Sequence, residues 1–520
     1  MEPTSSINRR IIQSAGIVMA SVVLSRALGF FRDWTVAQQI GSNAITDTYY
    51  AAFTLPDFLN YLVAGGSLSL TFIPILTRCI AEKREEDGWY VFSTVITLMG
   101  ILLVVGIIIG EFFASDLVRV IAPGFRGPER ERVIFLTRVM LPAQICFYLG
   151  GIMNAVQYAK GQFVVPSLAP VFYNLCIVLG GVLLASRIGI TGFALGVLAG
   201  AFIGNFLLQV YGSRRVGAKF SPNLDLRNHD FILFVKLSVP IMLALSIVFT
   251  DDWIIRWFGS YLVPASITWL TYAKTLMRVP LGVLGQAVGI ASFPFLAQLY
   301  SEGRFDDLNR TLNATLKGVI LLLVPVSVLT IAEKSPLVWF VFSHTRMHPA
   351  DLRATAATLG MFSIGMFAWG AQNILSRGFY AARDTITPAV VGTAMTFANL
   401  PVYWILCRRL QHLGLALASS IGVIVYCVIL FILLNRRTHS AQAGEVLKFF
   451  FKVAAAALVG GLVCFEVMKE LEAIVRWHST HGAFEVLVAA GVAGLLVTVL
   501  LSMLFRIHEL NRYLKRLKVW

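Results

Sequence analysis

The stretch Ser25-Arg26-Ala27-Leu28-Gly29-Phe30-Phe31-Arg32-Asp33 determines how the rest of the sequence is interpreted. Its two arginines and its aspartate lie in a segment that otherwise has the apolar content of a membrane helix. The next apolar segment carries two more aspartates, Asp47 and Asp57. A charge near the middle of a bilayer is costly, so such residues usually face a bundle interior or a watery cavity. The stretch therefore predicts a transporter built around a polar, partly cationic chamber.

Composition supports a membrane protein throughout. The 520 residues are 57% hydrophobic and 14% charged, with a mean hydropathy of +0.75. Apolar runs recur from one end to the other, each long enough for a helix to cross about 30 Å of hydrocarbon. Short alternating segments, typical of a membrane β-barrel, are lacking. We expect an all-α polytopic protein with about fourteen spans, among them 47–77, 133–158 and 352–380.

The net charge of +15 indicates orientation rather than a nucleic-acid partner, because the basic residues are scattered among short loops and the tail. Arg9, Arg78, Arg214 and Arg436 fall on one side if the spans alternate from a cytoplasmic N-terminus. Some basic residues, such as Arg126, fall on the other side, so the bias is imperfect. We expect a multi-pass membrane protein with both termini in the cytoplasm.

Two groups of six spans resemble each other. Matched motifs recur at an offset of roughly 220 to 224 residues, as an internal duplication produces. The pairs are Tyr158-Ala159 with Tyr380-Ala381, Pro166 with Pro388, Gly192 with Gly414, Pro56 with Pro280, and Pro74 with Pro294. Because each copy has an even number of helices, both insert with the same orientation. We expect a lobe at 1–225, a second lobe at 226–440, and two extra helices with a basic tail at 441–520.

Prolines within the helical runs mark bends. Pro56, Pro74, Pro280 and Pro294 each remove one backbone hydrogen bond and kink a helix. Both a hinge and a static bend are compatible with such a kink. The segments 121–125 and 336–340 follow the third and ninth spans and are expected to form short interfacial pieces.

The intramembrane charges are the candidate substrate-binding residues. On an ideal helix Arg26 and Asp33 share nearly one face, while Arg32 points about 120° away, which predicts different partners for Arg32 and Asp33. Lys274 and Arg278 are four residues apart on one face of the eighth span. Cations facing one cavity suit a phosphate or pyrophosphate group, which arginine grips with two parallel hydrogen bonds. Buried structural ion pairs are the alternative interpretation.

Signatures of enzyme chemistry are lacking in the sequence. It has no G-x-x-x-x-G-K-[ST] loop and no H-E-x-x-H motif. Its six cysteines are dispersed along the chain, and we expect them to be small core residues. We therefore expect a transporter, not an enzyme, with no bound cofactor and no confident metal site.

Several motifs together resemble the MurJ family, also called MviN, of bacterial lipid II flippases in the MOP exporter superfamily. They are Ser25-Arg26-x-x-Gly29-Phe30-x-Arg32-Asp33, Asp47 with Tyr49-Tyr50, Leu55-Pro56, Phe72-Ile73-Pro74, Ala122-Pro123-Gly124-Phe125, Pro280-x-Gly282-Val283-Leu284-Gly285, and Gly378-Phe379-Tyr380 before Asp384-Thr385-x-Thr387-Pro388. The resemblance implies fourteen helices and alternating access that moves an undecaprenyl-pyrophosphate-linked peptidoglycan precursor outward. It implies that Arg26, Arg32, Asp33 and Asp47 are cavity residues and that the last two helices help form a groove for the lipid tail. It also implies a location in the bacterial inner membrane and coupling to membrane potential, Na⁺ or H⁺. For a cation site in the second lobe, the candidates are Asp251, Asp252 and Asn399.

The sequence departs from the family pattern at four residues. Asn60 and Tyr61 stand where a basic pair is usual, Gly65 replaces a glutamate, and Thr275 replaces an arginine. These changes keep other functions open: export of another polyprenyl-linked glycan, ion-coupled antiport, or a scaffold that no longer transports. Lys274 and Arg278 supply charge near the lost arginine.

Overall fold

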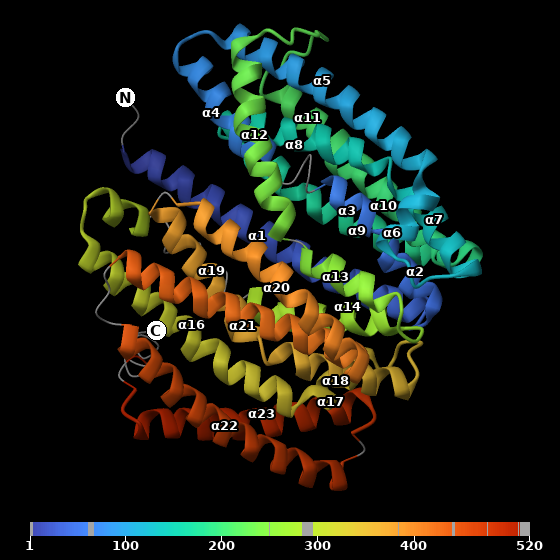
Figure 1. The fold of residues 1–520 in the computed structure, drawn as a ribbon, viewed down its shortest axis with the longest axis vertical. Coiled ribbons are helices and arrows are strands. Elements are labelled where there is room, and N and C mark those ends of the chain that lie inside the picture. Colours follow the sequence, from blue (N-terminus) through green and yellow to red (C-terminus); the bar gives the residue numbers. More distant parts are fainter. Residues whose placement is uncertain are drawn as a thin grey trace. The chain divides into compact units, whose positions relative to one another are not determined.

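The computed structural model describes residues 4–60, 67–248, 250–282, 295–382, 384–438, 443–475, 477–507 and 509. Within these residues the regular structure is helical (Figure 1). The chain divides into two compact units, Met1–Ala265 and Ser266–Trp520. The expectation of an all-α fold is confirmed.

The first unit begins with the longest helix described, α1. Its helices are α1 (Thr4–Gln39), α2 (Ala44–Ala52), α3 (Thr54–Leu59), α4 (Ser67–Ala81), α5 (Glu85–Phe112), α6 (Ala114–Ile121), α7 (Gly127–Met140), α8 (Ala143–Ala159), α9 (Val164–Ile188), α10 (Thr191–Gly200), the π-helical η2 (Ala201–Leu207), α11 (Leu208–Arg215), α12 (His229–Val248) and α13 (Thr250–Gly259). The segment after α5 forms the short helix α6, whose charged and apolar residues lie on opposite faces.

The expected span 47–77 is broken into shorter helices. The Asn43 side chain accepts hydrogen bonds from the backbone amides of Ile45 and Thr46 and so starts α2. That helix ends at Ala52, and α3 starts only two residues later. Pro56 lies in the first turn of α3, where a missing amide hydrogen is tolerated. Pro56 therefore follows a break between helices instead of kinking one continuous helix.

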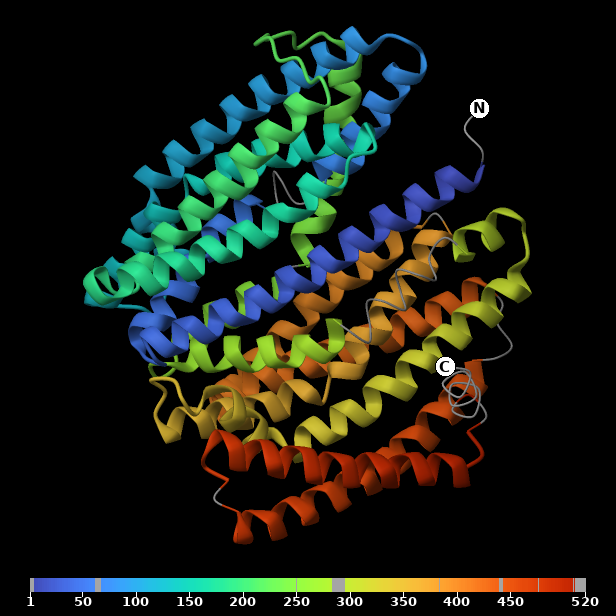
Figure 2. The same ribbon diagram turned by 180° about the vertical axis from the view of Figure 1, so that it is seen from behind.

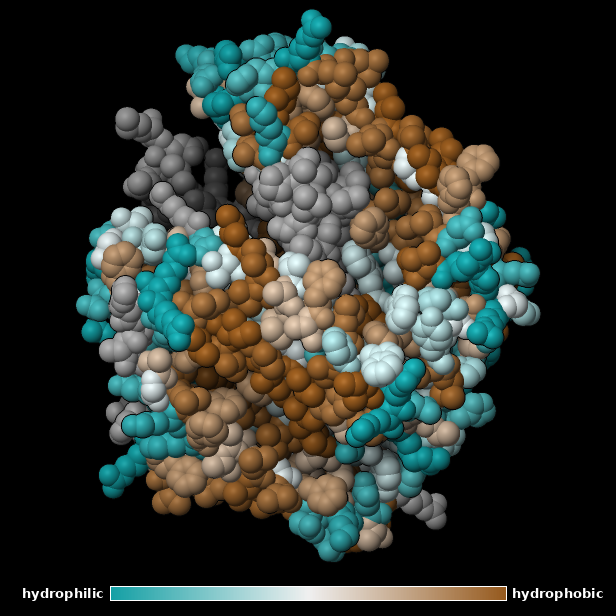
Figure 3. Space-filling view, in the orientation of Figure 1, coloured by the Kyte–Doolittle hydropathy of each residue, from teal (hydrophilic) through white to brown (hydrophobic). Residues whose placement is uncertain are grey.

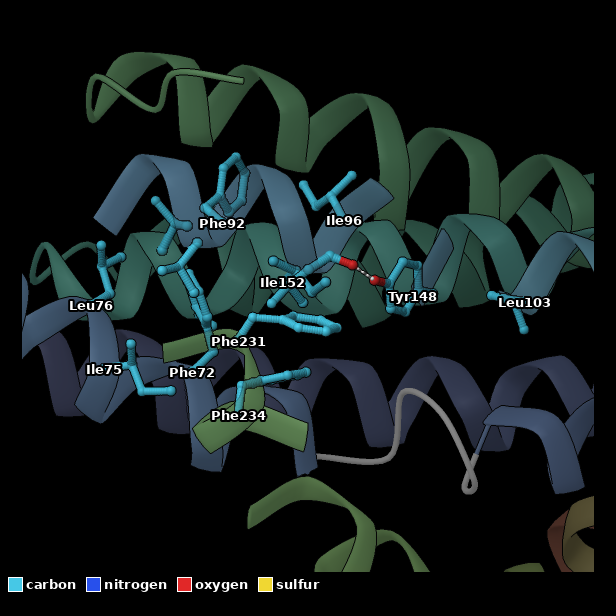
Figure 4. Packing of buried hydrophobic residues seen from close by; sticks show 14 of the residues in the cluster. Phe72, Ile75, Leu76, Phe92, Ile96, Leu103, Tyr148, Ile152, Phe231 and Phe234 are labelled. Carbon is cyan, nitrogen blue, oxygen red and sulfur yellow. Dashed lines mark hydrogen bonds between the residues drawn. The ribbon is translucent and has the colours of Figure 1, made fainter. Parts of the chain in front are cut away.

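An apolar core joins α4, α5, α8 and α12 (Figure 4). Phe72 lies between the rings of Phe92 and Phe234, at centroid distances of 6.1 and 6.4 Å. The hydroxyl of the fully buried Tyr148 donates to the carbonyl of Val95 at 2.7 Å, so its polar end is satisfied inside the apolar cluster. Fully buried aromatic rings of this size contribute strongly to holding the four helices together.

The helices α9 and α10 form a tight hairpin against which α1 packs (Figure 2). Small residues permit this contact: a Cβ added to Gly196 of α10 would lie 2.7 Å from the Cα of Ile177. The turn between the helices contains Gly189 with a φ of +60°, a conformation that glycine adopts without strain. The backbones of α9 and α10 can therefore lie in direct contact.

The helices α12 and α13 group with the first unit, although the repeat pattern assigns them to the second lobe. Arg78 of α4 pairs with Asp230 of α12, and the Thr71 hydroxyl bonds with that of Ser238 at 2.9 Å. The linker before α12 follows α5, where the Ser93 hydroxyl accepts from the amide of Ser221. Compactness therefore divides the chain after Ala265, and the sequence-based lobes 1–225, 226–440 and 441–520 remain a prediction from the repeats.

The second unit contains the remaining helices of the second copy and the last two helices of the chain. They are α14 (Ser266–Pro280), α16 (Phe305–Ala332), α17 (Lys334–Phe342), α18 (Pro349–Ser363), α19 (Met366–Ala381), α20 (Ile386–Leu410), α21 (His412–Arg437), α22 (Ala443–Ile474) and α23 (Thr480–Leu504). The expected span 352–380 is a helix pair, α18 and α19, bent by 41°.

The helix lengths show the duplication directly. Both α5 and α16 have 28 residues, and both α9 and α20 have 25. The short helices α6 and α17 have 8 and 9 residues. The turn after α20 contains Gln411 with a φ of +53°, at the position that matches Gly189 after α9. The two copies thus share helix order, helix length and a left-handed turn residue.

The last two helices pack against each other and against α16. A Cβ on Gly460 of α22 would lie 2.5 Å from the carbonyl oxygen of Gly494 of α23. On the adjacent residue, a Cβ on Gly461 would lie 2.4 Å from a methyl carbon of Val328 of α16. Adjacent glycines on α22 therefore allow two close helix contacts, as small residues do in membrane proteins.

Nine described helices are long and apolar enough to cross a membrane, or ten if α18 and α19 form one bent span. Exposed apolar side chains cover the outer helices, and Figure 3 shows them along the flank of the second unit. Those on α22 and α23 include Leu447, Phe451, Leu458, Leu462, Leu496 and Leu500. The chain is therefore a multi-pass membrane protein, while the expected number of fourteen spans stays a prediction.

Candidate substrate-binding site

The centre of the candidate site is Arg32 on α1. Its Nε and Nη2 donate to the Oδ1 of Asp33 at 3.0 and 2.9 Å. The Asp33 side chain is 4% exposed, whereas that of Arg32 is 26% exposed. The carboxylate thus anchors a guanidinium that keeps an accessible surface. The long arginine side chain thus folds back on its neighbour, a contact that helix geometry does not predict.

Further polar groups surround the Arg32–Asp33 pair. The Tyr50 hydroxyl of α2 donates to the Oδ1 of Asp33 at 3.5 Å. Asn174 of α9 accepts a long hydrogen bond of 3.4 Å from the Nη1 of Arg32. The amide of the same Asn174 donates to the Pro170 carbonyl at 2.9 Å, which fixes its orientation. Residues of α1, α2 and α9 therefore position the Arg32 guanidinium, directly or through Asp33.

A second ion pair lies in the first unit. The Nη1 of Arg256, on α13, donates to an Asp57 oxygen on α3 at 2.9 Å. The two side chains are 18% and 29% exposed. Asp57 also lies close enough to Arg32 and Asp252 to interact with their charges. Charges from α1, α3 and α13 therefore form a cluster in which both cations have acidic neighbours.

Arg256 was not predicted from the sequence, although a signal was present. It follows Arg32 by 224 residues, the same offset that separates Pro56 from Pro280. Asn174 was also missed, because a single asparagine in an apolar helix carries no periodic signal. The contacts of both residues join segments more than 140 residues apart.

The other first-unit candidates have different environments. Arg26 is exposed on α1. Asp47 is buried in the first turn of α2, where the helix dipole favours a carboxylate. Asp251 and Asp252 are half-buried at the start of α13. The roles of these four residues stay predictions.

In the second unit, Lys274 and Arg278 of α14 differ in exposure. Lys274 is buried with its Nζ 5.7 Å from the centre of the Phe362 ring, and Arg278 is exposed. Positions four apart differ by about 40°, so the two residues share one side of the helix while the edge of the buried surface passes between them. Their role in binding stays a prediction. Thr275, where the family pattern has an arginine, is half-buried.

The candidate cation ligands do not form a recognisable metal centre. The Asn399 amide donates to the Ala418 carbonyl at 3.0 Å, which ties α20 to α21. Among the residues that the structure describes, no group of three or more His, Cys, Asp or Glu side chains could hold a metal ion. A cation role for Asp251, Asp252 and Asn399 stays a prediction.

The predicted hinge prolines occupy three kinds of position. Pro74 lies inside α4, and Pro280 is the last residue of α14. Pro56 is in the first turn of α3, and Pro294 lies outside the described residues. The hinge role itself is untested.

Comparison with known proteins identifies the family. The model of the family described as lipid II flippase MurJ matches residues 36–475. The chain belongs to the MurJ family. It is 25% identical over 512 residues to the probable lipid II flippase MurJ of Vibrio cholerae, with 96% of each chain covered. It is 26% identical over 450 residues to the lipid II flippase MurJ of Burkholderia cenocepacia, with 85% of this chain and 87% of that protein covered.

Solved structures share the MurJ fold. The structure of a lipid II flippase MurJ in an inward closed conformation matches with a TM-score of 0.78 at 22% identity, over 94% of this chain and 98% of that one. An inward-facing MATE multidrug resistance transporter of the MOP superfamily matches with a TM-score of 0.66 at 15% identity, over 83% and 99%. The family-model match begins at residue 36, after Arg32 and Asp33. The binding role considered for these two residues therefore rests on their contacts in the structure.

Proposed function

We propose that this chain is a flippase that carries lipid II, an undecaprenyl-pyrophosphate-linked peptidoglycan precursor, across the bacterial inner membrane. The match to the lipid II flippase family over residues 36–475 carries this proposal. Members of this family are described as lipid flippases. Moving a lipid between leaflets does not require a catalytic residue.

The geometry at Arg32 supports a role in headgroup binding. A guanidinium presents a planar set of donors that matches two phosphate oxygens. Asp33 occupies the Nε and Nη2 side of Arg32, and Asn174 makes only a 3.4 Å contact with Nη1. An arriving phosphate oxygen would displace this long contact at little cost. Arg32 is thereby held in place before substrate binds, which reduces the entropy lost on binding.

The Arg256–Asp57 pair offers a second cation whose availability depends on conformation. It joins α13 to α3, and α13 is also held to the turn after α6, where the Gly124 amide donates to the Ser260 hydroxyl at 3.0 Å. Movement of α13 away from α3 would release the arginine. In this proposal Arg32 binds pyrophosphate first and Arg256 joins it as the helices move.

Membrane potential would drive the transfer. The pyrophosphate is anionic, and an inside-negative potential favours outward movement of negative charge by about 2.3 kcal/mol per elementary charge at 100 mV. Both termini lie in the cytoplasm in this proposal, as the basic loops favour. The exposed apolar residues of α22 and α23 offer a surface along which the polyprenyl tail would travel in lipid.

Growth rescue tests the proposal. A bacterium depleted of its own lipid II flippase would receive the wild-type chain, the Arg32→Ala variant, or the Arg119→Ala variant, at equal membrane levels. Arg119 is an exposed arginine on α6 and serves as the matched control. We expect rescue by the wild type and the control but not by Arg32→Ala. Rescue by Arg32→Ala would refute the binding role, and failure of the inserted wild type would favour another polyprenyl-linked substrate or a scaffold.

A further inference from the structure

A buried carboxyl group lies where the last two helices pack beside the junction of α16 and α17. Glu333 stands at the junction between α16 and α17, and only 7% of the residue is exposed. One of its carboxyl oxygens, Oε1, has no hydrogen-bond partner. An unpartnered carboxylate oxygen in such a place would be expensive to keep ionised.

The neighbours of Glu333 come from α22 and α23. The backbone of Gly491 on α23 approaches the carboxyl so closely that an added Cβ would lie 3.0 Å from Oε1. The thiol of Cys464 on α22 is within hydrogen-bonding reach. Cys464 itself belongs to an apolar cluster with Met468, Val486 and Ala490. The carboxyl is therefore enclosed by two helices that the internal duplication does not contain.

No cation that the structure describes compensates this carboxyl. Lys334, the next residue, extends toward Gly360 of α18 instead. The ionisable residues on the neighbouring turns of α22 and α23 are exposed, which places them on the outer faces; they are Glu466, Lys469, Glu470 and Glu485. Within the described residues, the ionisable group that contacts Glu333 is the Cys464 thiol. Burial, partly offset by the Cys464 hydrogen bond, raises the pKa of Glu333 to about 7.

We propose that Glu333 is a proton-binding site and that its protonated form holds α22 and α23 against α16 and α17. A neutral carboxyl is compatible with the apolar contact around Cys464. Ionisation places an uncompensated charge there and favours separation of the helix pairs or entry of water. The site is built from residues outside the Arg32 cluster, and the inference does not depend on which substrate is carried.

Infrared spectroscopy tests the proton site. The full-length protein in lipid nanodiscs would be titrated while the C=O stretch of protonated carboxyl groups is recorded. We expect a band that disappears as the pH rises through about 7. It should be lost in Glu333→Gln and retained in Glu466→Gln, a matched change at an exposed position. Absence of a band specific to Glu333 at pH 6 would overturn the proposal.

A second variant keeps the test decisive if Glu333→Gln fails to insert. Cys464→Ala removes the hydrogen bond that, among the described side chains, favours the ionised carboxylate, so the midpoint of the titration should move to higher pH. An unchanged or lower midpoint would contradict the site as described.

Thiol labelling tests the structural consequence. Cys464 is fully buried, so alkylation by N-ethylmaleimide reports separation of α22 from its neighbours. A variant with Cys464 as its sole cysteine would be labelled in membranes at pH 6 and pH 8.5, each rate normalised to the detergent-unfolded protein. We expect several-fold faster normalised labelling at pH 8.5, and no such increase when Glu333→Gln is added. Equal normalised rates at both pH values would refute the coupling between protonation and helix contact.

Discussion

The two compact units contain a duplicated scaffold but differ in how their charges are arranged. In the first unit, Arg32 and Asp33 pair on α1 while Arg256 and Asp57 pair nearby. In the second, the cation Lys274 lies over an aromatic ring, and the neighbouring Thr275 is uncharged. Because Arg256 follows Arg32 by 224 residues, each copy supplies one of these two arginines, although both lie in the first unit. We therefore expect the binding function to be carried by a few side chains of the first unit on a repeated frame.

Exchanging Arg32 for lysine tests whether the arrangement of donors or only the charge matters. We expect Arg32→Lys to rescue growth poorly, because an ammonium cannot make the Nε and Nη2 bonds to Asp33 together with a bidentate phosphate contact. Arg32→Ala should abolish rescue. Binding of lipid II to the purified variants, measured by native mass spectrometry, should fall in the same order. Full rescue by Arg32→Lys would show that charge alone is sufficient.

Breaking the second ion pair should have the next largest effect. Arg256→Gln leaves the Asp57 carboxylate without its main partner, and we expect a loss of about 2 kcal/mol in the free energy of unfolding. The double variant Asp57→Asn with Arg256→Gln should recover part of that stability, because no unpaired charge remains. Thermal unfolding of the four proteins of this cycle measures the coupling. If the losses of the two single variants add up to the loss of the double variant, the ion pair contributes nothing to the free energy of unfolding.

The matched hairpins α9–α10 and α20–α21 provide a packing comparison. Gly196 of α10 corresponds to Ala418 of α21 at an offset of 222 residues. A Cβ at Gly196 would lie 2.7 Å from the Ile177 Cα, so Gly196→Ala should destabilise the protein by about 1–3 kcal/mol. The reciprocal Ala418→Gly should cost about 1 kcal/mol, mainly through lost helix propensity. Thermal unfolding checks both values, and equal losses would contradict the difference in packing.

The smallest effect concerns the start of α20. Although burial opposes it, hydrogen bonds from the Thr387 backbone amide and hydroxyl, together with Arg437, lower the pKa of Asp384. A lowered folded-state pKa means that the stabilisation is present above the ordinary pKa near 4 and is lost as the pH falls through the lowered value. Asp384→Asn should reduce stability by about 1 kcal/mol at pH 7. The corresponding Gln162→Ala in the first unit should show no comparable dependence on pH.

Much of the fold was predictable because it follows from local properties. Apolar length and composition indicated membrane helices, and the constant offset between matched residues such as Pro166 and Pro388 indicated the duplication. The break of the segment 47–77 was not predicted, since the cap at Asn43 and the interruption at Phe53 compete with an apolar pattern that continues through them.

The candidate site was predictable only in part. Arg32 and Asp33 stand out because charges are rare in apolar segments, but their mutual pairing depends on side-chain conformation. Arg256 and Asn174 reach the site through contacts far apart in the chain, which helical periodicity does not encode. The same limitation explains Lys274 and Arg278, since one helix face predicts their spacing but not where the buried surface ends.

Reconstitution tests the proposed division between the two units most directly. The purified chain would be placed in lipid vesicles that contain labelled lipid II, and movement of the headgroup between leaflets would be followed with an imposed potential. We expect flipping by the wild type and the exposed control Arg119→Ala, and none by correctly folded Arg32→Ala. Flipping by Arg32→Ala at the wild-type rate would contradict the assignment of headgroup binding to the first unit.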